Sequence, residues 1–295
     1  MRSRWAASVC ASVWIGFACA AEPAQAREQE QAPASAPASA PASGPGSARA
    51  PSPSRELIVC ADPNNLPFSN RAGEGFENKL VELVAKDLGV HVRYVWWAQR
   101  RGFARHTLDE SICDLWPGIA SATDVTATTS PYYRSTYVFV TRADRSLRAL
   151  TLDDPRLRRL SVGVQMIGND ATNTPPAHAL ANRGLTQNVR GYMLYGNYEQ
   201  PNPPAAIIDA VSRGDIDVAV VWGPTAGFFA ARSKTPLRLE PVTPVLDDAR
   251  WPMQFDISMG IRRGDTPLHD QIEHVLTRQR RSIDRILNDY HVPRS

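Results

Sequence analysis

The chain has 295 residues, of which 43% are hydrophobic and 21% are charged, which is typical of a soluble globular protein with room for two domains. Its 33 basic and 30 acidic residues leave a formal net charge of +3. So small an excess of positive charge indicates no preference for nucleic acid or for a membrane surface.

Residues 1–26 have the three parts of a secretory signal peptide. Two arginines precede an apolar run from Val9 to Phe17, and small residues follow it. Two cleavage points are open, after Ala20 and after Ala26, because each ends a small-x-small tripeptide. The apolar run is too short for a permanent span. We therefore expect a periplasmic protein with no stable membrane insertion.

Residues 27–54 form a linker rich in Ala, Pro and Ser. The unit Ala-Pro-Ala-Ser occurs three times within residues 32–43. Such a composition cannot bury a core and favours an extended, disordered segment. Cys19 leaves lipidation open as an alternative, although the residues before it match the lipoprotein pattern poorly. The folded body is expected to begin near Arg55.

The first part of the body alternates strands and helices. We predict strands at residues 57–60, 90–96 and 113–116, and helices at residues 76–88 and 103–110. Gly89 supplies the left-handed residue that ends the first helix. A turn made of Asp, Pro and Asn follows the first strand and carries an apolar side chain, Phe68, at its tip.

The same alternation restarts after residue 142. We predict strands at 160–164 and 218–222, and helices that begin around Asn173-Thr174-Pro175, Asn202-Pro203 and Gly223-Pro224. Extended segments at 137–141 and 239–245 link the two parts, and a strand at 255–261 with a helix from Leu268 rejoins the first.

This order predicts an α/β protein of two lobes with two hinge crossovers. Lobe 1 would comprise residues 55–141 and 245–295, and lobe 2 residues 142–244. An interlobe cleft is where such folds hold a small ligand.

Cys60 and Cys113 are the two cysteines of the body. In an exported chain an even pair indicates a disulfide. Two free buried thiols are the alternative.

Six strings carry a family resemblance: CADPNNLPFSN, GEGFEN, YVWWAQRRGF, SPYYRSTYVFVTR, GNDATNTPPAHALANRG and DVAVVWGPTAGFFA. They resemble the J proteins of methanol-oxidation gene clusters, MxaJ and XoxJ. The order of the elements, with the strings CDLWPG, SPYY and GDIDVAVVWGP, resembles the type II periplasmic binding proteins, of which the J proteins look like a narrower branch. The resemblance covers about residues 55–293. It implies a solute-binding-protein fold that serves as an accessory protein of a quinoprotein (PQQ-dependent) methanol dehydrogenase.

The sequence departs from the amino-acid binders of this fold at one informative place. Those relatives commonly carry an Arg about eight residues before the Pro-Tyr-Tyr string, where it can clamp a ligand carboxylate. Here residues 123–126 are Thr-Asp-Val-Thr. An amino acid is therefore a poor candidate ligand.

The predicted cleft residues follow strand ends, because ligands of α/β sheets lie beyond the carboxyl ends of the strands. They are Asp62, Asn64, Asn65, Phe68, Arg100, Arg101, Trp116, Gln165, Asn169, Asp170 and Trp222. Arg100 and Arg101 either replace the missing clamp or face solvent. Trp222 is either a stacking surface or part of the core.

Templates for nucleophilic, metal and phosphate chemistry are absent from the sequence, so we predict no enzyme activity, no cofactor and no metal. Acid/base catalysis as in dehydratases of this fold, by Asp62, Glu77 or Asp170, is the minor alternative. We predict a periplasmic accessory protein that binds or matures a PQQ-dependent methanol or alcohol dehydrogenase. Rival functions are an ABC-transporter receptor for a small, anionic ligand and a carrier of the quinone cofactor.

Overall fold

The computed structural model describes residues 55–121, 123–167, 173–194 and 198–294. Contacts divide the chain into Met1–Ala50 and one compact unit, Pro51–Ser295. The predicted signal peptide and linker lie outside the described residues, as do Asn169 and Asp170. All helices and strands named below belong to the compact unit.

The first group of strands is parallel at its centre. β1 (Glu56–Ala61) lies between β4 (His91–Trp96) and β5 (Leu115–Ala120) and runs parallel to both. β14 (Gln254–Ile261) runs antiparallel to β5 and to the short β6 (Ala127–Thr128). A small hairpin, β2 (Asn64–Asn65) with β3 (Ser69–Asn70), follows β1.

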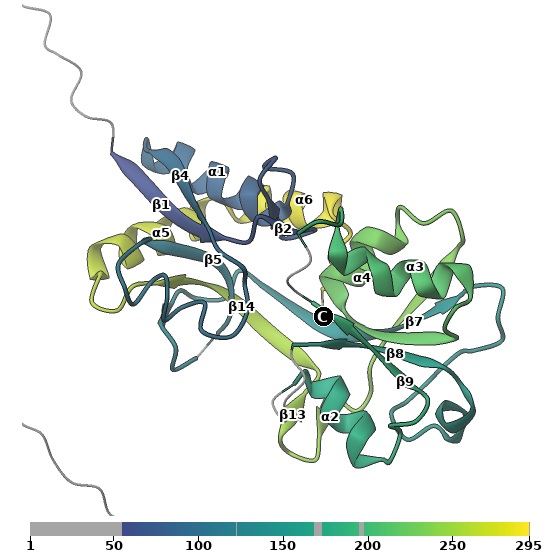
Figure 1. Ribbon diagram of the computed structural model, residues 1–295. Coiled ribbons are helices and arrows are strands. Elements are labelled where there is room, and N and C mark those ends of the chain that lie inside the picture. The colour runs from purple at the N-terminus through teal and green to yellow at the C-terminus, as the bar shows by residue number, and fades with distance from the viewer. Residues whose placement is uncertain (1–54, 122, 168–172, 195–197, 295) are drawn as a thin grey trace, which may run out of the picture. The chain divides into compact units, whose positions relative to one another are not determined.

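Three helices pack together beside these strands: α1 (Phe76–Leu88), α5 (Thr266–Arg278) and α6 (Arg280–Asp289). In Figure 1 the yellow C-terminal helices lie next to α1, although about 180 residues separate them in the sequence. Their shared core contains Phe76, Leu80, Leu115, Ile272 and Leu287.

The second group of strands has the same parallel centre. β8 (Val162–Met166) lies between β9 (Val189–Met193) and β10 (Val218–Trp222), and all three are parallel. Helices α2 (Pro175–Asn182), α3 (Ala206–Arg213) and α4 (Gly223–Ala230) follow the strands. The remaining elements are the short helices η1 (Pro155–Arg159) and η2 (Pro203–Ala205) and the strands β11 (Leu237–Pro241), β12 (Leu246–Asp247) and β13 (Trp251–Pro252).

One long strand, β7 (Tyr133–Arg142), belongs to both groups. Its first four residues pair with β14, and the rest pair with β10 and β11. The chain returns to the first group between β11 and β14. In Figure 1, β7 and β14 run between the two groups, which gives the curled, mixed sheet of a two-lobed α/β protein. The lobe boundaries at residues 141 and 245 stay a prediction.

Most predicted elements are confirmed, α1 and β10 to the residue. Gly89 ends α1 with φ of 65°, a backbone conformation that favours glycine. The helix predicted at residues 103–110 is wrong, because that segment is a series of turns. The segment does have buried residues at helical spacing: Phe103, Ala104, Thr107 and Leu108. Its backbone hydrogen bonds, however, are those of irregular turns, and these turns pack Phe103 and Leu108 against the disulfide.

The disulfide predicted between Cys60 and Cys113 is confirmed. The two Cα atoms lie 5.7 Å apart and the bond closes a loop with a sequence separation of 53. Both cysteines are fully buried against Phe103 and Leu108. The bond therefore ties the end of β1 to the start of β5, the two strands whose ends carry the candidate site.

Candidate functional site

The turn after β1 is built around the buried carboxylate of Asp62. This carboxylate accepts hydrogen bonds from the backbone N–H of Asn64 (2.9 Å) and of Gln99 (2.8 Å). The turn then meets the N-terminus of α1, where the carbonyls of Pro67 and Phe68 accept from the first helical N–H groups. A Cβ at Gly75 would lie 1.9 Å from the Phe68 carbonyl oxygen, so this approach requires glycine.

A central cavity of about 280 Å³ lies where the strand ends of the two groups meet. From the first group it is lined by Asn65, Phe68, Glu77, Gln99, Gly118, Ile119 and Ala120, and from the second by Gln165, Ile167, Thr174, Leu194, Trp222 and Thr225. The connecting strands β7 and β14 add Tyr133, Tyr137, Phe255 and Ile257. Most of this wall is apolar or aromatic.

Trp222 is held at the cavity by its backbone. Its N–H donates to Gln165 Oε1 (2.8 Å), and its indole contacts the rings of Tyr137 and Phe255. Gln165 Nε2 is buried and has no hydrogen-bond partner among the described residues. The tryptophan is thus both a cavity wall and a packing partner of the core clusters on either side.

Glu77 is the one acidic or basic side chain among the described residues of the cavity wall. It is 3% exposed and its carboxyl lies against the Cα of Gly118, where a Cβ would come within 2.0 Å of Oε1. Burial, and secondarily the negative charge of Asp62, raises the pKa of Glu77 from 4.5 to about 8. At neutral pH this carboxyl is mostly protonated.

Of the predicted cleft residues, Asn65, Phe68, Gln165 and Trp222 line this cavity together. Asp62 lies beneath it as the support of the turn. That these residues bind a ligand stays a prediction. The sequence did not predict the wall residues Tyr133, Tyr137 and Phe255. They lie on β7 and β14, which the sequence pattern indicated only as links between the two lobes.

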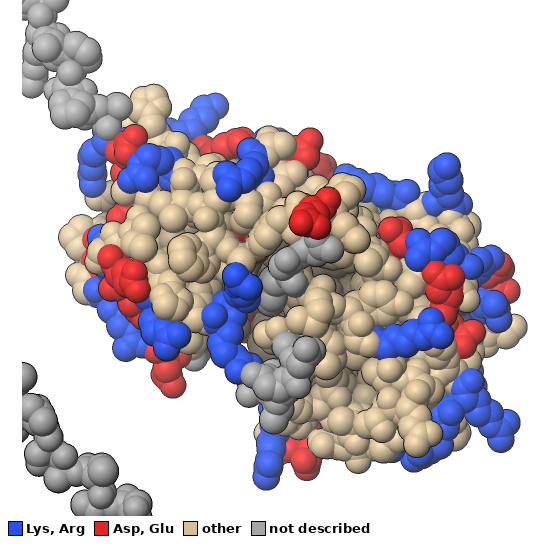
Figure 2. Space-filling view, viewed as in Figure 1, with Lys and Arg blue, Asp and Glu red and all other residues tan. Residues whose placement is uncertain are grey.

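The remaining predicted residues line outer hollows on the first group of strands. Asn64 and Arg100 border one hollow with Arg71, Trp96, Trp97 and Tyr198. Arg100, Arg101 and Trp116 border a second one with Arg105, Val125 and Arg263. Figure 2 shows basic side chains at the border of the hollow between the two groups of strands, with a mostly uncharged surface inside it.

Two hydrogen bonds join the turn after β1 to the segment between β9 and α3. Asn64 Nδ2 donates to the carbonyl of Gln200 (2.9 Å), and the Tyr198 hydroxyl donates to Asp62 Oδ2 (3.1 Å). Burial first, and then the Asp62 carboxylate, raises the pKa of Tyr198. Sequence patterns gave no signal for these contacts, since they join residues 136 positions apart.

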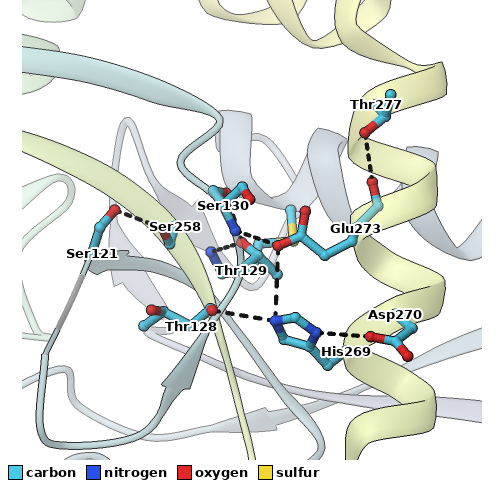
Figure 3. Close-up of polar contacts among 10 residues, drawn as sticks. Ser121, Thr128, Thr129, Ser130, Ser258, His269, Asp270, Glu273 and Thr277 are labelled. Carbon is cyan, nitrogen blue, oxygen red and sulfur yellow. Dashed lines mark hydrogen bonds and ion pairs between the residues drawn. The ribbon is translucent and has the colours of Figure 1, made fainter.

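The loop before β7 is fixed by polar contacts to α5 and β14 (Figure 3). The Ser130 backbone N–H donates to the Glu273 carboxylate, and a His269 ring nitrogen lies 3.3 Å from the Thr128 carbonyl oxygen. The Met259 N–H donates to Thr129 Oγ1 (3.0 Å). These contacts fix the start of β7, which places Tyr133 in the cavity wall.

The described part of the chain contains neither a membrane-spanning helix nor a cluster of metal ligands. No helix there is long and apolar enough to cross a membrane. No group of three or more His, Cys, Asp or Glu side chains in those residues could hold a metal ion.

Comparisons with known proteins place the chain in a family. No protein-family model matches it. Protein MoxJ of Methylorubrum extorquens is 32% identical over 305 aligned residues, which cover 99% of this chain and 96% of that protein. The chain belongs to the MoxJ family. Protein MoxJ of Paracoccus denitrificans is 28% identical and covers 80% of this chain and 88% of its own.

Solved structures of this MoxJ-family protein's relatives agree with its fold. The periplasmic binding protein XoxJ of Methylobacterium extorquens AM1 has a TM-score of 0.65 at 35% identity and covers 81% of this chain and 99% of its own. MxaJ of Methlophaga aminisulfidivorans MPT has a TM-score of 0.70 at 24% identity and covers 81% of this chain and 100% of its own, which supports the fold. The predicted two-lobed type II periplasmic binding protein fold is confirmed.

Proposed function

We propose that this MoxJ-family protein is exported by its signal peptide and serves in the periplasm as an accessory protein that binds a PQQ-dependent, methanol-oxidising dehydrogenase. The observation that carries the proposal is its similarity to MoxJ over nearly the whole chain. The resemblance to the J proteins of methanol-oxidation gene clusters supplies the role.

The described cavity wall gives no support to the rival functions. A receptor for a small anion, or a carrier of the quinone with its three carboxylates, needs basic groups to balance the ligand charge. The described residues of the cavity wall include no Lys, Arg or His. Arg100 and Arg101, which were the candidates for this role, border the outer hollows.

The surface that we propose meets the dehydrogenase surrounds the segment 96–105. It exposes three apolar or aromatic side chains: Trp97 (42% exposed), Val125 (48%) and Tyr198 (42%). Interfaces are enriched in aromatic residues and Arg, and these residue types dominate binding hot spots. We call this set, together with its neighbouring arginines, the outer basic surface; its residues are Arg71, Trp97, Arg100, Arg101, Arg105, Val125, Tyr198 and Arg263.

The charges of the outer basic surface favour a partner with an acidic face. The described residues that line the two hollows include five arginines but only two acidic residues, Asp109 and Asp124. Arg71 stacks on Trp96 with its guanidinium carbon 5.6 Å from the ring centre. The complementary face on the dehydrogenase would be acidic, and association would weaken as salt increases.

The proposed function is tested by deleting the gene in the organism that encodes it and measuring PQQ-dependent methanol oxidation in periplasmic extracts. We expect a loss of dehydrogenase activity that the wild-type gene restores, and a direct complex between the two purified proteins. Unchanged activity together with no complex would contradict the accessory role.

The docking surface has its own test. Arg100→Glu combined with Arg105→Glu should weaken the purified complex at least tenfold, because repulsion replaces attraction at an acidic face. Arg281→Glu with Arg285→Glu on α6 is the matched control, with the same change in net charge at another surface. Equal weakening by both pairs would show that only net charge matters.

A further inference from the structure

The cavity wall contains a carboxyl group, that of Glu77, which has no counter-ion among the described residues. Glu77 is buried on α1, and no hydrogen bond or ion pair with another described residue reaches its side chain. A buried acid without a partner is costly and is retained at few positions without a function. Its location on the cavity wall means that a ligand could supply the partner.

Aromatic rings surround the same cavity. The ring centres of Tyr137 and Trp222 lie 5.2 Å apart with an interplanar angle of 62°, and those of Trp222 and Phe255 lie 5.9 Å apart at 71°. Phe68 and Tyr133 complete the five aromatic residues of the described wall. The π faces of aromatic rings carry partial negative charge and attract cations.

The groups around Glu77 add no positive charge to the cavity. Those that interact electrostatically with it are Asp62 after β1, Tyr94 on β4, Tyr133 at the start of β7 and Tyr132 just before that strand. On α5, which packs against α1, Arg278 pairs with Asp87 near the C-terminal end of α1. The described surroundings of the carboxyl are thus neutral or negative.

Ionising Glu77 to bind a cationic ligand costs little free energy at neutral pH. With a pKa of about 8, the carboxylate form is about tenfold less populated than the acid at pH 7. A cation in the cavity would have to overcome only that tenfold factor. An anion would meet the nearby negative charge of Asp62 and no described base.

We propose that the central cavity binds a small organic cation, a substituted ammonium group, with the Glu77 carboxylate as its counter-ion and Tyr137, Trp222 and Phe255 around it. The volume of about 280 Å³ lies just below the usual range for ligand sites, which suits a ligand of few heavy atoms. This site goes beyond the proposed function and does not depend on it. Its occupant displaces a proton from Glu77, which leaves to solvent.

The test is a matched series of ligands that differ in charge. Choline, its neutral isostere 3,3-dimethyl-1-butanol and the anion 3,3-dimethylbutanoate are titrated into the purified protein, with calorimetry and tryptophan fluorescence as readouts. We expect saturable binding of choline, at least tenfold tighter than either comparison compound. Choline affinity should rise about tenfold from pH 7 to pH 9, since Glu77 becomes ionised near pH 8.

Two variants assign the binding to this site. Glu77→Gln should weaken choline binding at least tenfold at pH 9 and abolish its pH dependence, whereas Glu82→Gln, an exposed acid on the same helix, should change neither. Trp222→Leu should also weaken binding, at a residue that does not titrate. Equal binding of choline and its neutral isostere, or no saturable response to choline, tetramethylammonium and benzyltrimethylammonium at pH 9, would overturn the proposal.

Discussion

Glu77→Gln should change the pH dependence of stability, because the buried acid holds its proton far above the usual range. Its pKa is raised from 4.5 to about 8, so between these values the folded protein binds more protons than the unfolded chain. Stability therefore falls as pH rises through this window, and the full contribution of the neutral acid is present only below pH 4.5.

The size of the effect follows from the two pKa values. A tenfold difference in proton affinity between the folded and unfolded states corresponds to about 1.4 kcal/mol, so about 4 kcal/mol is lost between pH 5 and pH 9. Gln has nearly the same shape as protonated Glu and does not titrate. The variant should match the wild type at pH 5 and exceed its free energy of unfolding by about 4 kcal/mol at pH 9.

Urea unfolding at pH 5, 7 and 9, with the disulfide intact, measures this difference. All other titrating groups are common to the two proteins, so the contributions of those that do not interact with Glu77 cancel. Glu82→Gln serves as the control and should give a curve parallel to that of the wild type. If the Glu77→Gln curve is also parallel, Glu77 titrates normally and the electrostatic description of the cavity is wrong.

Three further predictions concern packing and contacts. Gly118→Ala should destabilise the fold by about 1–3 kcal/mol, because its Cβ would lie 2.0 Å from Glu77 Oε1, and Glu77→Ala in the same chain should remove most of that cost, as a double-mutant cycle would show. Replacing Cys60 and Cys113 together by Ser should cost about 4 kcal/mol in urea unfolding for a loop of this length; no loss would contradict the chain-entropy account. Tyr198→Phe should cost about 1 kcal/mol or less, since the lost hydrogen bond is partly exposed, and should speed hydrogen exchange of the neighbouring Glu199 and Gln200 amides.

The elements that could be predicted from the sequence are those whose local and tertiary signals agree. α1 has an apolar face, an acid in its first turn and a left-handed glycine at its end, so its bounds follow from the sequence. β10 is a wholly apolar strand between a turn and a Gly-Pro helix start. The alternation of strands and helices, which occurs twice along the chain, is then enough to predict a two-lobed fold.

The segment 103–110 shows where this reasoning fails. Its buried residues have helical spacing, yet its backbone follows turns that fit Phe103 and Leu108 around the disulfide. The sequence did not predict β9, because none of its side chains is fully buried and Gly191 interrupts its pattern. In both cases tertiary contacts outweigh local propensity.

The cavity itself was only partly predictable. Strand ends point to Asn65, Gln165 and Trp222, because the parallel topology brings such ends together. Glu77 gave a weaker signal, since an acid in the first turn of a helix ordinarily complements the helix dipole in solvent. Only the packing of α1 against β5 turns that position inward, to lie on Gly118.

The distribution of charge separates the two proposed binding roles. The arginines of the segment 96–105 border the outer hollows, where an acidic protein can reach them, whereas the described cavity wall carries one carboxyl and no base. A cation in the cavity and an acidic protein on the outer surface would each meet the opposite charge. Substitutions at Arg100 and at Glu77 should therefore act on different partners, because neither residue lines the other's site.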